Sequence, residues 1–115
     1  MLRRPDTISF GDLTKRATFQ QPFEERNADG MLVQRYDDQF TVWAHVRHLR
    51  GGEMVMQSRM QSKSPVILTV RRSPDAERIT SEWRAVIDGR FYEVREDWRP
   101  TEDRLFVEML AESAA

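Results

Sequence analysis

Apolar and polar side chains alternate along residues 40–49, a pattern typical of a half-buried β-strand. One face carries the apolar side chains Phe40, Val42, Ala44 and Val46. The opposite face is polar except for Trp43. A large aromatic side chain in that position predicts that this second face is covered as well, by a short helix or by another subunit. The strand is expected to end before the turn residues Gly51 and Gly52.

Similar patterns predict further strands at residues 16–21, 66–71, 83–87, 90–94 and 104–112. Pro22 is expected to end the first of these. Residues 66–71 are apolar on both faces, which predicts a central strand. Six short strands would expose several edges unless the sheet closed on itself. The pattern therefore predicts a mainly β fold, a small β barrel of about six strands with one short inserted α helix and long loops.

The clearest local signal is Asp88-Gly89 between two alternating segments. This pair is typical of a two-residue type I′ turn, because both central residues of that turn need positive φ. The turn fixes the register of the hairpin, so that Ala85 faces Tyr92 and Trp83 faces Val94. The same register sets Arg84 opposite Glu93, and we expect a cross-strand ion pair there of about 0.2 to 1 kcal/mol.

The segments between the strands differ in character. Residues 53–62 contain good helix formers and neither Gly nor Pro, which predicts a helix of about two to three turns that Ser64-Pro65 ends. Residues 1–15 are expected to form an extended arm that needs a docking site to be ordered. Residues 23–38 are polar and favour a long exposed loop, with a hairpin returning along 31–34 as the alternative. Residues 72–81 and 98–103 are expected to be surface loops.

Composition excludes several classes of protein. The 115 residues suit a single domain, 1–115. The formal net charge of -1 does not mark a basic nucleic-acid binder. Without cysteine there is no disulfide framework, thiolate nucleophile or cysteine zinc site. No window approaches the roughly 18 apolar residues of a membrane span, so no membrane partner is expected.

The sequence provides no catalytic set. His48 lies three positions after His45, and because this separation is odd a strand places the two on opposite faces, where they cannot share a metal ion without a bulge. Two histidines and scattered carboxylates do not assemble a nucleophile triad. Gly51-Gly52 lacks the spacing and the lysine of a phosphate-binding loop. We therefore expect no enzymatic activity, no metal and no cofactor.

Nucleic-acid binding is the main alternative. Arginines gather at 71, 72 and 78, but acidic residues are interleaved with them. The aromatic residues Trp83 and Tyr92 share the apolar face of their hairpin, which favours a place in the core over a stacking platform. One hypothesis is therefore a monomeric OB-like or SH3-like barrel that binds single-stranded nucleic acid. A small enzyme is a further, weaker hypothesis, and both rank behind the one given next.

Taken in chain order, these segments resemble the head-tail joining proteins of tailed bacteriophages, also called head completion, head closure or stopper proteins. The resemblance spans residues 11–112. The features that carry it are Gly11-Asp12-Leu13 before the first strand, the Asp29-Gly30 loop, Trp43-Ala44-His45-Val46, the Gly52-Glu53 helix start, and the hairpin 84–94 before the final strand.

The resemblance implies a structural virion protein that assembles as a homo-oligomeric, dodecameric ring. Its partners would be a portal or adaptor protein on the head side and a tail terminator or tail tube protein on the tail side. DNA would pass non-specifically through the central channel, which the ring would gate. The protein would lie in the host cytoplasm before assembly and at the head-tail interface afterwards, in an infectious phage, a prophage or a gene transfer agent.

The resemblance also assigns roles by position. Residues 47–64, with the inserted helix at 51–64, match the segment that faces or plugs the channel. The channel-facing candidates are Arg47, Arg50, Glu53, Gln57, Arg59 and Lys63. The extended N-terminal segment, residues 1–15, and the C-terminal end would meet neighbouring rings. The candidates for contacts between subunits or rings are Ile8, Phe10, Leu13, Trp43, Met54, Met56 and Trp98.

Overall fold

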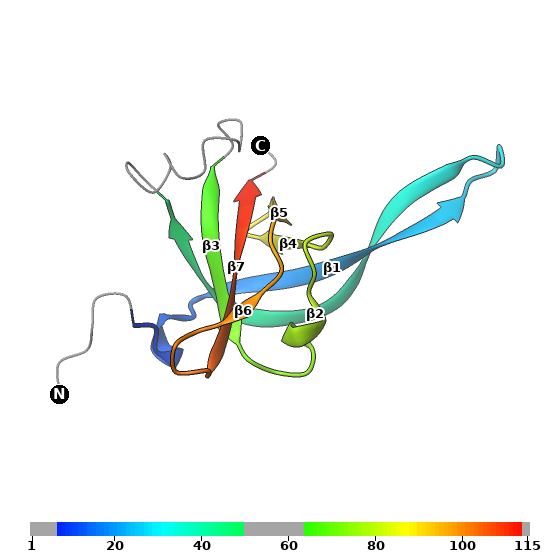
Figure 1. Ribbon diagram of the computed structural model, residues 1–115. Helices are drawn as coiled ribbons and strands as arrows, with labels where there is room; N and C mark the ends of the chain where they lie inside the picture. Colours follow the sequence, from blue (N-terminus) through cyan, green and yellow to red (C-terminus); the bar gives the residue numbers. More distant parts are fainter. Residues whose placement is uncertain (1–6, 50–63, 114–115) are drawn as a thin grey trace.

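The computed structural model describes residues 7–49 and 64–113, and β-strands dominate them (Figure 1). The strands are β1 (Lys15–Arg26), β2 (Leu32–His48), β3 (Pro65–Arg71), β4 (Arg84–Ile87), β5 (Arg90–Val94), β6 (Arg99–Pro100) and β7 (Phe106–Ser113). Two short 3-10 helices, η1 (Phe10–Asp12) and η3 (Ala76–Arg78), complete the described elements. The inserted helix expected at 51–64 lies outside the described residues except for Ser64.

Six antiparallel strands close into a barrel in the order β1, β2, β3, β7, β5, β4. Hydrogen bonds between β4 and β1, from Ala17 to Gln20, complete the circuit. The prediction of a mainly β fold with a small barrel of about six strands is confirmed. β6 adds two residues beside β7, opposite Val107 and Glu108. Closure leaves the barrel wall without the exposed edges that short open sheets present.

The interior of the barrel is filled by side chains from all six strands, and the largest fully buried ones include Phe19, Leu68 and Met109. β3 is buried along its length from Pro65 to Val70, as expected of a central strand. Trp83 and Tyr92 belong to this core, with exposures of 3% and 6%. A second, smaller cluster of Leu49, Ile67 and Leu110 lies on the other face of the wall.

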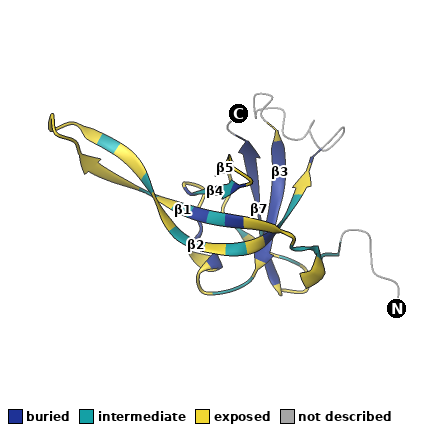
Figure 2. Ribbon diagram, turned by 180° about the vertical axis from the view of Figure 1, so that it is seen from behind, coloured by how far each residue is buried: buried dark blue, intermediate teal, exposed yellow. Residues whose placement is uncertain are grey.

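β1 and β2 extend well beyond the barrel as a two-stranded ribbon that projects to one side (Figures 1 and 2). We call this ribbon, residues 20–39, the arm. The prediction that Pro22 ends the first strand was wrong. β1 continues to Arg26, and Pro22 pairs with Tyr36 of β2. Only Ala17 to Gln20 of β1 pair with β4, so Pro22 lies on a stretch with one unpaired edge, where the missing N–H is tolerated. The hairpin alternative for residues 23–38 is confirmed, with a return strand longer than expected.

The arm leaves the barrel at a β-bulge. Phe19 pairs with Phe40 and Gln20 pairs with Asp38, so Gln39 is the extra residue on β2. A bulge bends its strand and increases the local twist. The side chain of Gln39 accepts a hydrogen bond of 2.7 Å from Nη2 of Arg78 in η3, which ties the bulge to the loop 72–81. The direction of the arm is therefore set where it leaves the wall.

The hairpin of β4 and β5 has the predicted register, with Ala85 opposite Tyr92 and Ile87 opposite Arg90. Asp88 and Gly89 have φ values of 52° and 75°, which the type I′ turn requires. Arg84 lies opposite Glu93 as expected, but the expected ion pair is absent from the described contacts. The guanidinium of Arg84 turns to aromatic rings and to Gln20 instead, and Glu93 pairs with Arg95 at 3.4 Å.

The C-terminal strand begins two residues later than predicted. Arg104 has a φ of 64°, which belongs to a turn and not to a strand, and Leu105 is half exposed. From Phe106 onwards the side chains alternate as expected, with Val107 and Met109 in the main core. The loop 72–81 is not wholly on the surface either, because Ala76 and Ile79 are buried around η3.

Candidate functional site: a groove and an arm

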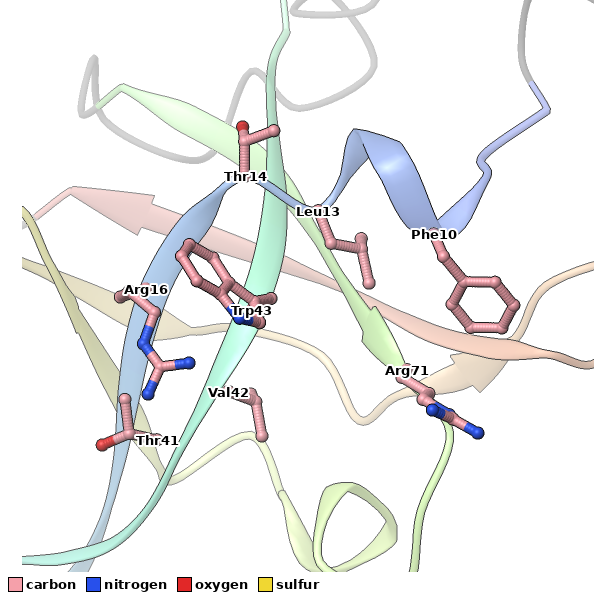
Figure 3. Close-up of a pocket in the computed structure, with 8 residues that line it drawn as sticks. All are labelled: Phe10, Leu13, Thr14, Arg16, Thr41, Val42, Trp43 and Arg71. Atoms are coloured by element: carbon pink, nitrogen blue, oxygen red, sulfur yellow. The ribbon is translucent and has the colours of Figure 1, made fainter.

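An open groove of about 750 Å³ lies beside η1, along β1 and β2 and as far as the end of β3 (Figure 3). The described residues of its lining are mostly apolar by area, with two arginines and no carboxylate among them. The residues that line it are Phe10, Leu13, Thr14, Arg16, Thr41, Val42, Trp43 and Arg71. We call this feature the groove. It brings three of the predicted contact residues, Phe10, Leu13 and Trp43, into one site.

Trp43 is the most exposed tryptophan of the described residues, with 51% of its surface accessible. It lies on the outer face of β2 directly opposite Arg16 of β1. The guanidinium of Arg16 stacks on the indole at 4.7 Å, a cation-π contact that fixes the ring in the wall of the groove. The described residues leave half of this side chain uncovered, so its expected covering stays a prediction.

The N-terminal segment reaches the barrel through Phe10. The ring of Phe10 lies 4.9 Å from the ring of Phe106 in β7, and Arg71 of β3 stacks on it at 5.2 Å. The short helix η1 is held by Ser9 and Asp12: the backbone N–H and the hydroxyl of Ser9 both donate to Oδ2 of Asp12, at 2.9 and 3.2 Å. This capping box positions Phe10 although half of its surface stays exposed.

The far end of the arm is a compact turn with exposed apolar side chains. Oδ1 of Asn27 accepts hydrogen bonds from the backbone N–H groups of Asp29 and Met31, at 2.9 and 3.0 Å. Gly30 has a φ of 78°, the left-handed conformation that favours glycine. Met31 and Leu32 follow it with exposures of 64% and 58%. The turn thus holds two large apolar side chains out in solvent.

The remaining predicted positions divide into three groups. Ile8 is half-buried beside η1, and Arg47 lies exposed on β2 opposite Ile67. Trp98 packs within its own chain: its indole N–H donates to the carbonyl oxygen of Glu77 at 2.9 Å and Arg72 stacks on its ring at 5.4 Å. The other candidates lie outside the described residues, namely Arg50, Glu53, Met54, Met56, Gln57, Arg59 and Lys63.

Among the charged groups, Glu112 is the most deeply buried in the described residues. It faces Glu93 across β5 and β7, and Arg95 lies between the two carboxylates. Arg95 contacts Oε1 of Glu112 through Nη2 at 2.5 Å and through Nε at 2.7 Å. Oε2 of Glu112 has no hydrogen-bond partner among the residues that the structure describes. The arginine compensates two like charges that the sheet register sets opposite each other.

One carboxylate has a perturbed acidity. Hydrogen bonds from the backbone N–H of Leu105 and, second, from the hydroxyl of Thr101 lower the pKa of Asp103 below its ordinary value. Asp103 is fully exposed and holds the turn before β7. The hydrogen bonds that lower this pKa are those that stabilise the turn.

His45 and His48 lie on β2, half-buried and exposed respectively, opposite Thr69 and Val66 of β3. In the part of the chain that the structure describes, no three His, Asp or Glu side chains are placed to hold a metal ion. No helix of that part is long and apolar enough to cross a membrane. The burial of Trp83 and Tyr92 removes both from the list of stacking platforms.

The end of the arm is the feature that the sequence reasoning missed. The signal was present, because Met31 and Leu32 are large apolar residues directly after a Gly turn in a polar region. Two large apolar side chains exposed side by side in a polar loop indicate an interaction surface. The groove was found only in part, because Arg16 and Arg71 come to it from strands that are distant in sequence.

Comparison with known proteins agrees with the resemblance seen in the sequence. A family model described as phage head completion protein matches residues 8–114. No curated protein matches the chain. The fold is similar to the solution structure of protein SF1141 from Shigella flexneri 2a, with 22% identity and a TM-score of 0.73 over 94% of this chain and 98% of that one. It is also similar to a chain in the virion of a native gene transfer agent particle, with 18% identity and a TM-score of 0.61 over 89% of this chain and 96% of that one.

Proposed function

Because the chain belongs to the phage head completion protein family, a family of virion structural proteins, we propose that it assembles as a ring between the portal adaptor and the tail. In this position it completes the DNA-filled head, gates the DNA channel and docks the tail. The observation that carries the proposal is the family match from residue 8 to residue 114, nearly the whole chain.

The fold is suited to such a role. A closed barrel gives a rigid body, and the arm and the groove offer two distinct contact surfaces at its sides. The similarity to a chain of a gene transfer agent virion supports a fold used in such particles.

The finer assignments belong to this proposal. The ring is dodecameric, with the adaptor on the head side and a tail terminator or tail tube protein on the tail side. Arg47 lies exposed near the end of β2, the strand that leads to the segment proposed to face the channel. The protein waits in the host cytoplasm and joins the particle at the head-tail interface.

Deletion of the gene from the genome that encodes it tests the proposal. Electron microscopy of the particles is expected to show DNA-containing heads and separate tails, and a plasmid copy is expected to restore tailed particles. Normal tailed particles from the deletion strain would overturn the proposal.

A second experiment separates a ring protein from a single-strand binder. The purified chain is mixed with the adaptor of the same particle and imaged by negative stain, and its binding to a labelled oligonucleotide is measured at two salt concentrations. Ring-shaped assemblies on the adaptor support the proposal. A persistent monomer with salt-dependent oligonucleotide affinity contradicts it, because counterion release makes such affinity fall steeply with salt.

A further inference from the structure

Exposed large apolar side chains gather on two surfaces of this protein. Of the seven found in the described residues, Phe10 and Trp43 line the groove, and Phe23, Met31 and Leu32 lie on the arm. Contiguous apolar surface on a small protein marks an interaction site. Leu32 shares one face of the ribbon with Glu24, Met31 lies at its end, and Phe23 lies on the opposite face.

The two surfaces carry opposite charge. The groove has Arg16 and Arg71 and no carboxylate in its lining. Within the described residues both guanidinium groups stack on aromatic rings and neither has a carboxylate partner. The arm, residues 20–39, carries five carboxylates against two arginines.

Two carboxylates without an ion-pair partner lie near the end of the arm. Arg35 pairs with Glu25, and Arg26 donates to the carbonyl oxygen of Gly30 at 2.7 Å. In the described part of the chain this leaves Glu24 and Asp29 near the end, and Asp37 and Asp38 near the base, without an ion-pair partner. Five carboxylates and two arginines give the arm a formal charge of -3. An apolar tip on an acidic arm therefore corresponds to an apolar groove with basic neighbours.

The arm cannot reach the groove of its own chain. β1 passes the groove at Arg16 and runs away from it, and the ten residues from there to Arg26 extend about 33 Å. Figures 1 and 2 show the arm tip and the N-terminal segment at opposite ends of the molecule. A contact between the two surfaces therefore joins two copies.

We propose that the arm of one copy docks in the groove of the next, with Met31 and Leu32 against Phe10 and Trp43. Because the two surfaces differ, the contact is head-to-tail, and repeating it gives a ring when the rotation closes. The inference rests on the proposed ring function and names the surfaces that build the ring.

Cysteine cross-linking tests the contact directly, because the chain has no cysteine of its own. Thr14→Cys, in the groove lining, is mixed with Met31→Cys, at the arm tip, and the mixture is treated with a short bismaleimide. We expect at least tenfold more heterodimer than from Thr14→Cys mixed with Glu82→Cys, an exposed position outside both surfaces. Equal yields from the two mixtures would overturn the inference.

Charge exchange tests the electrostatic part. Glu24→Arg in the arm copy is expected to lower the heterodimer yield several-fold, and Arg71→Glu in the groove copy is expected to do the same. Combining the two reversed copies is expected to restore most of the yield. If the heterodimer yield stays low when the two reversed copies are combined, the proposed charge pairing is wrong. Thermal unfolding of each variant checks that it folds.

The inference and the proposed function can fail separately. A genomic variant with Met31→Ser and Leu32→Ser is compared with the deletion strain. If the deletion blocks tail joining and the double variant forms normal particles, the arm contact is wrong and the function stands. If both block tail joining, the contact is supported. If the deletion strain forms normal tailed particles, the function is wrong whatever the cross-linking shows.

Discussion

The guanidinium carbon of Arg84 lies 3.8 Å from the centre of the Tyr36 ring, and this contact joins the barrel to the base of the arm. The same guanidinium carbon lies 4.1 Å from the centre of the Phe91 ring, and Nε of Arg84 donates to Oε1 of Gln20 at 2.5 Å. A planar cation that stacks on aromatic rings is a geometry that arginine provides and lysine does not. Arg84 therefore restrains the direction of the arm.

Replacing Arg84 with Ala is expected to release the arm. The loss of two stacking contacts and one hydrogen bond should reduce the free energy of unfolding by about 1 to 2 kcal/mol. Hydrogen exchange is expected to rise in residues 22–38 more than in the barrel strands. Arg90→Ala, an exposed arginine of β5 next to the turn, serves as the control and should change neither quantity. Equal exchange in the two variants would show that Arg84 does not restrain the arm.

Replacing Arg95 with Met should destabilise the barrel. The change leaves the carboxylate of Glu112, which is 4% exposed, without its cation and opposite Glu93. Removing one partner of a buried ion pair costs more than the pair contributes, and we expect a loss of about 2 kcal/mol because Arg95 is partly solvated. Denaturant unfolding measures it.

The double variant Arg95→Met with Glu112→Gln is the matched test of that mechanism. Neutralising Glu112 removes the uncompensated charge, so the double variant should be more stable than Arg95→Met alone. An additive loss would mean that Arg95 acts through packing alone.

The sequence predicted those parts of the fold in which local chemistry decides the outcome. Asp88-Gly89 determines a turn type, and the turn determines the register of four residue pairs. The sequence could not predict which groups the side chain of Arg84 contacts. Gln20 and Tyr36 come close to it only because β1 pairs with both β4 and β2. Sequence alone favoured an ion pair with Glu93, which faces Arg84 across the hairpin. In the structure Arg84 contacts Gln20 and Tyr36 instead.

The candidate site divides in the same way. Trp43 could be identified because it breaks an alternating pattern. The arm could not, because Pro22 and many charged residues favour a loop, and only the unpaired outer edge makes Pro22 acceptable in a strand. Arg71 reaches the groove through the pairing of β3 with β2, in which Val70 lies opposite Ala44.

Gly89→Ala is expected to lower the free energy of unfolding by about 1 kcal/mol. A Cβ at this position meets nothing within 4 Å, so the whole cost comes from the φ of 75°. Gly11→Ala is the matched control, because its Cβ would lie at an ordinary 3.9 Å from Oγ of Ser9 and its φ is not positive. Thermal unfolding of the two variants should separate them, and equal losses would contradict the role of backbone conformation.

The stabilising effect of Asp103 should depend on pH. Its pKa is lowered in the folded state by the hydrogen bonds from Leu105 and Thr101, so the ionised form stabilises the fold at pH values above the ordinary aspartate pKa. This contribution is lost as the pH falls through the lowered pKa. The stability difference between the wild type and Asp103→Asn should therefore be largest near neutral pH and shrink as the pH falls below the ordinary aspartate pKa of about 3.9. A difference independent of pH would contradict the assignment.

Trp43→Ala and Trp83→Ala should differ in what they damage. Trp83 is 3% exposed in the core, and its truncation should cost about 3 to 5 kcal/mol of the free energy of unfolding. Trp43 is half exposed and contacts Arg16, so its truncation should cost about 0.5 to 1 kcal/mol. In the Thr14→Cys background, however, Trp43→Ala should reduce cross-linking to Met31→Cys at least tenfold, because a tryptophan at the centre of an interface contributes about 2 kcal/mol or more. A large loss of stability with unchanged cross-linking would place Trp43 in the core of its own chain and not at a contact between copies.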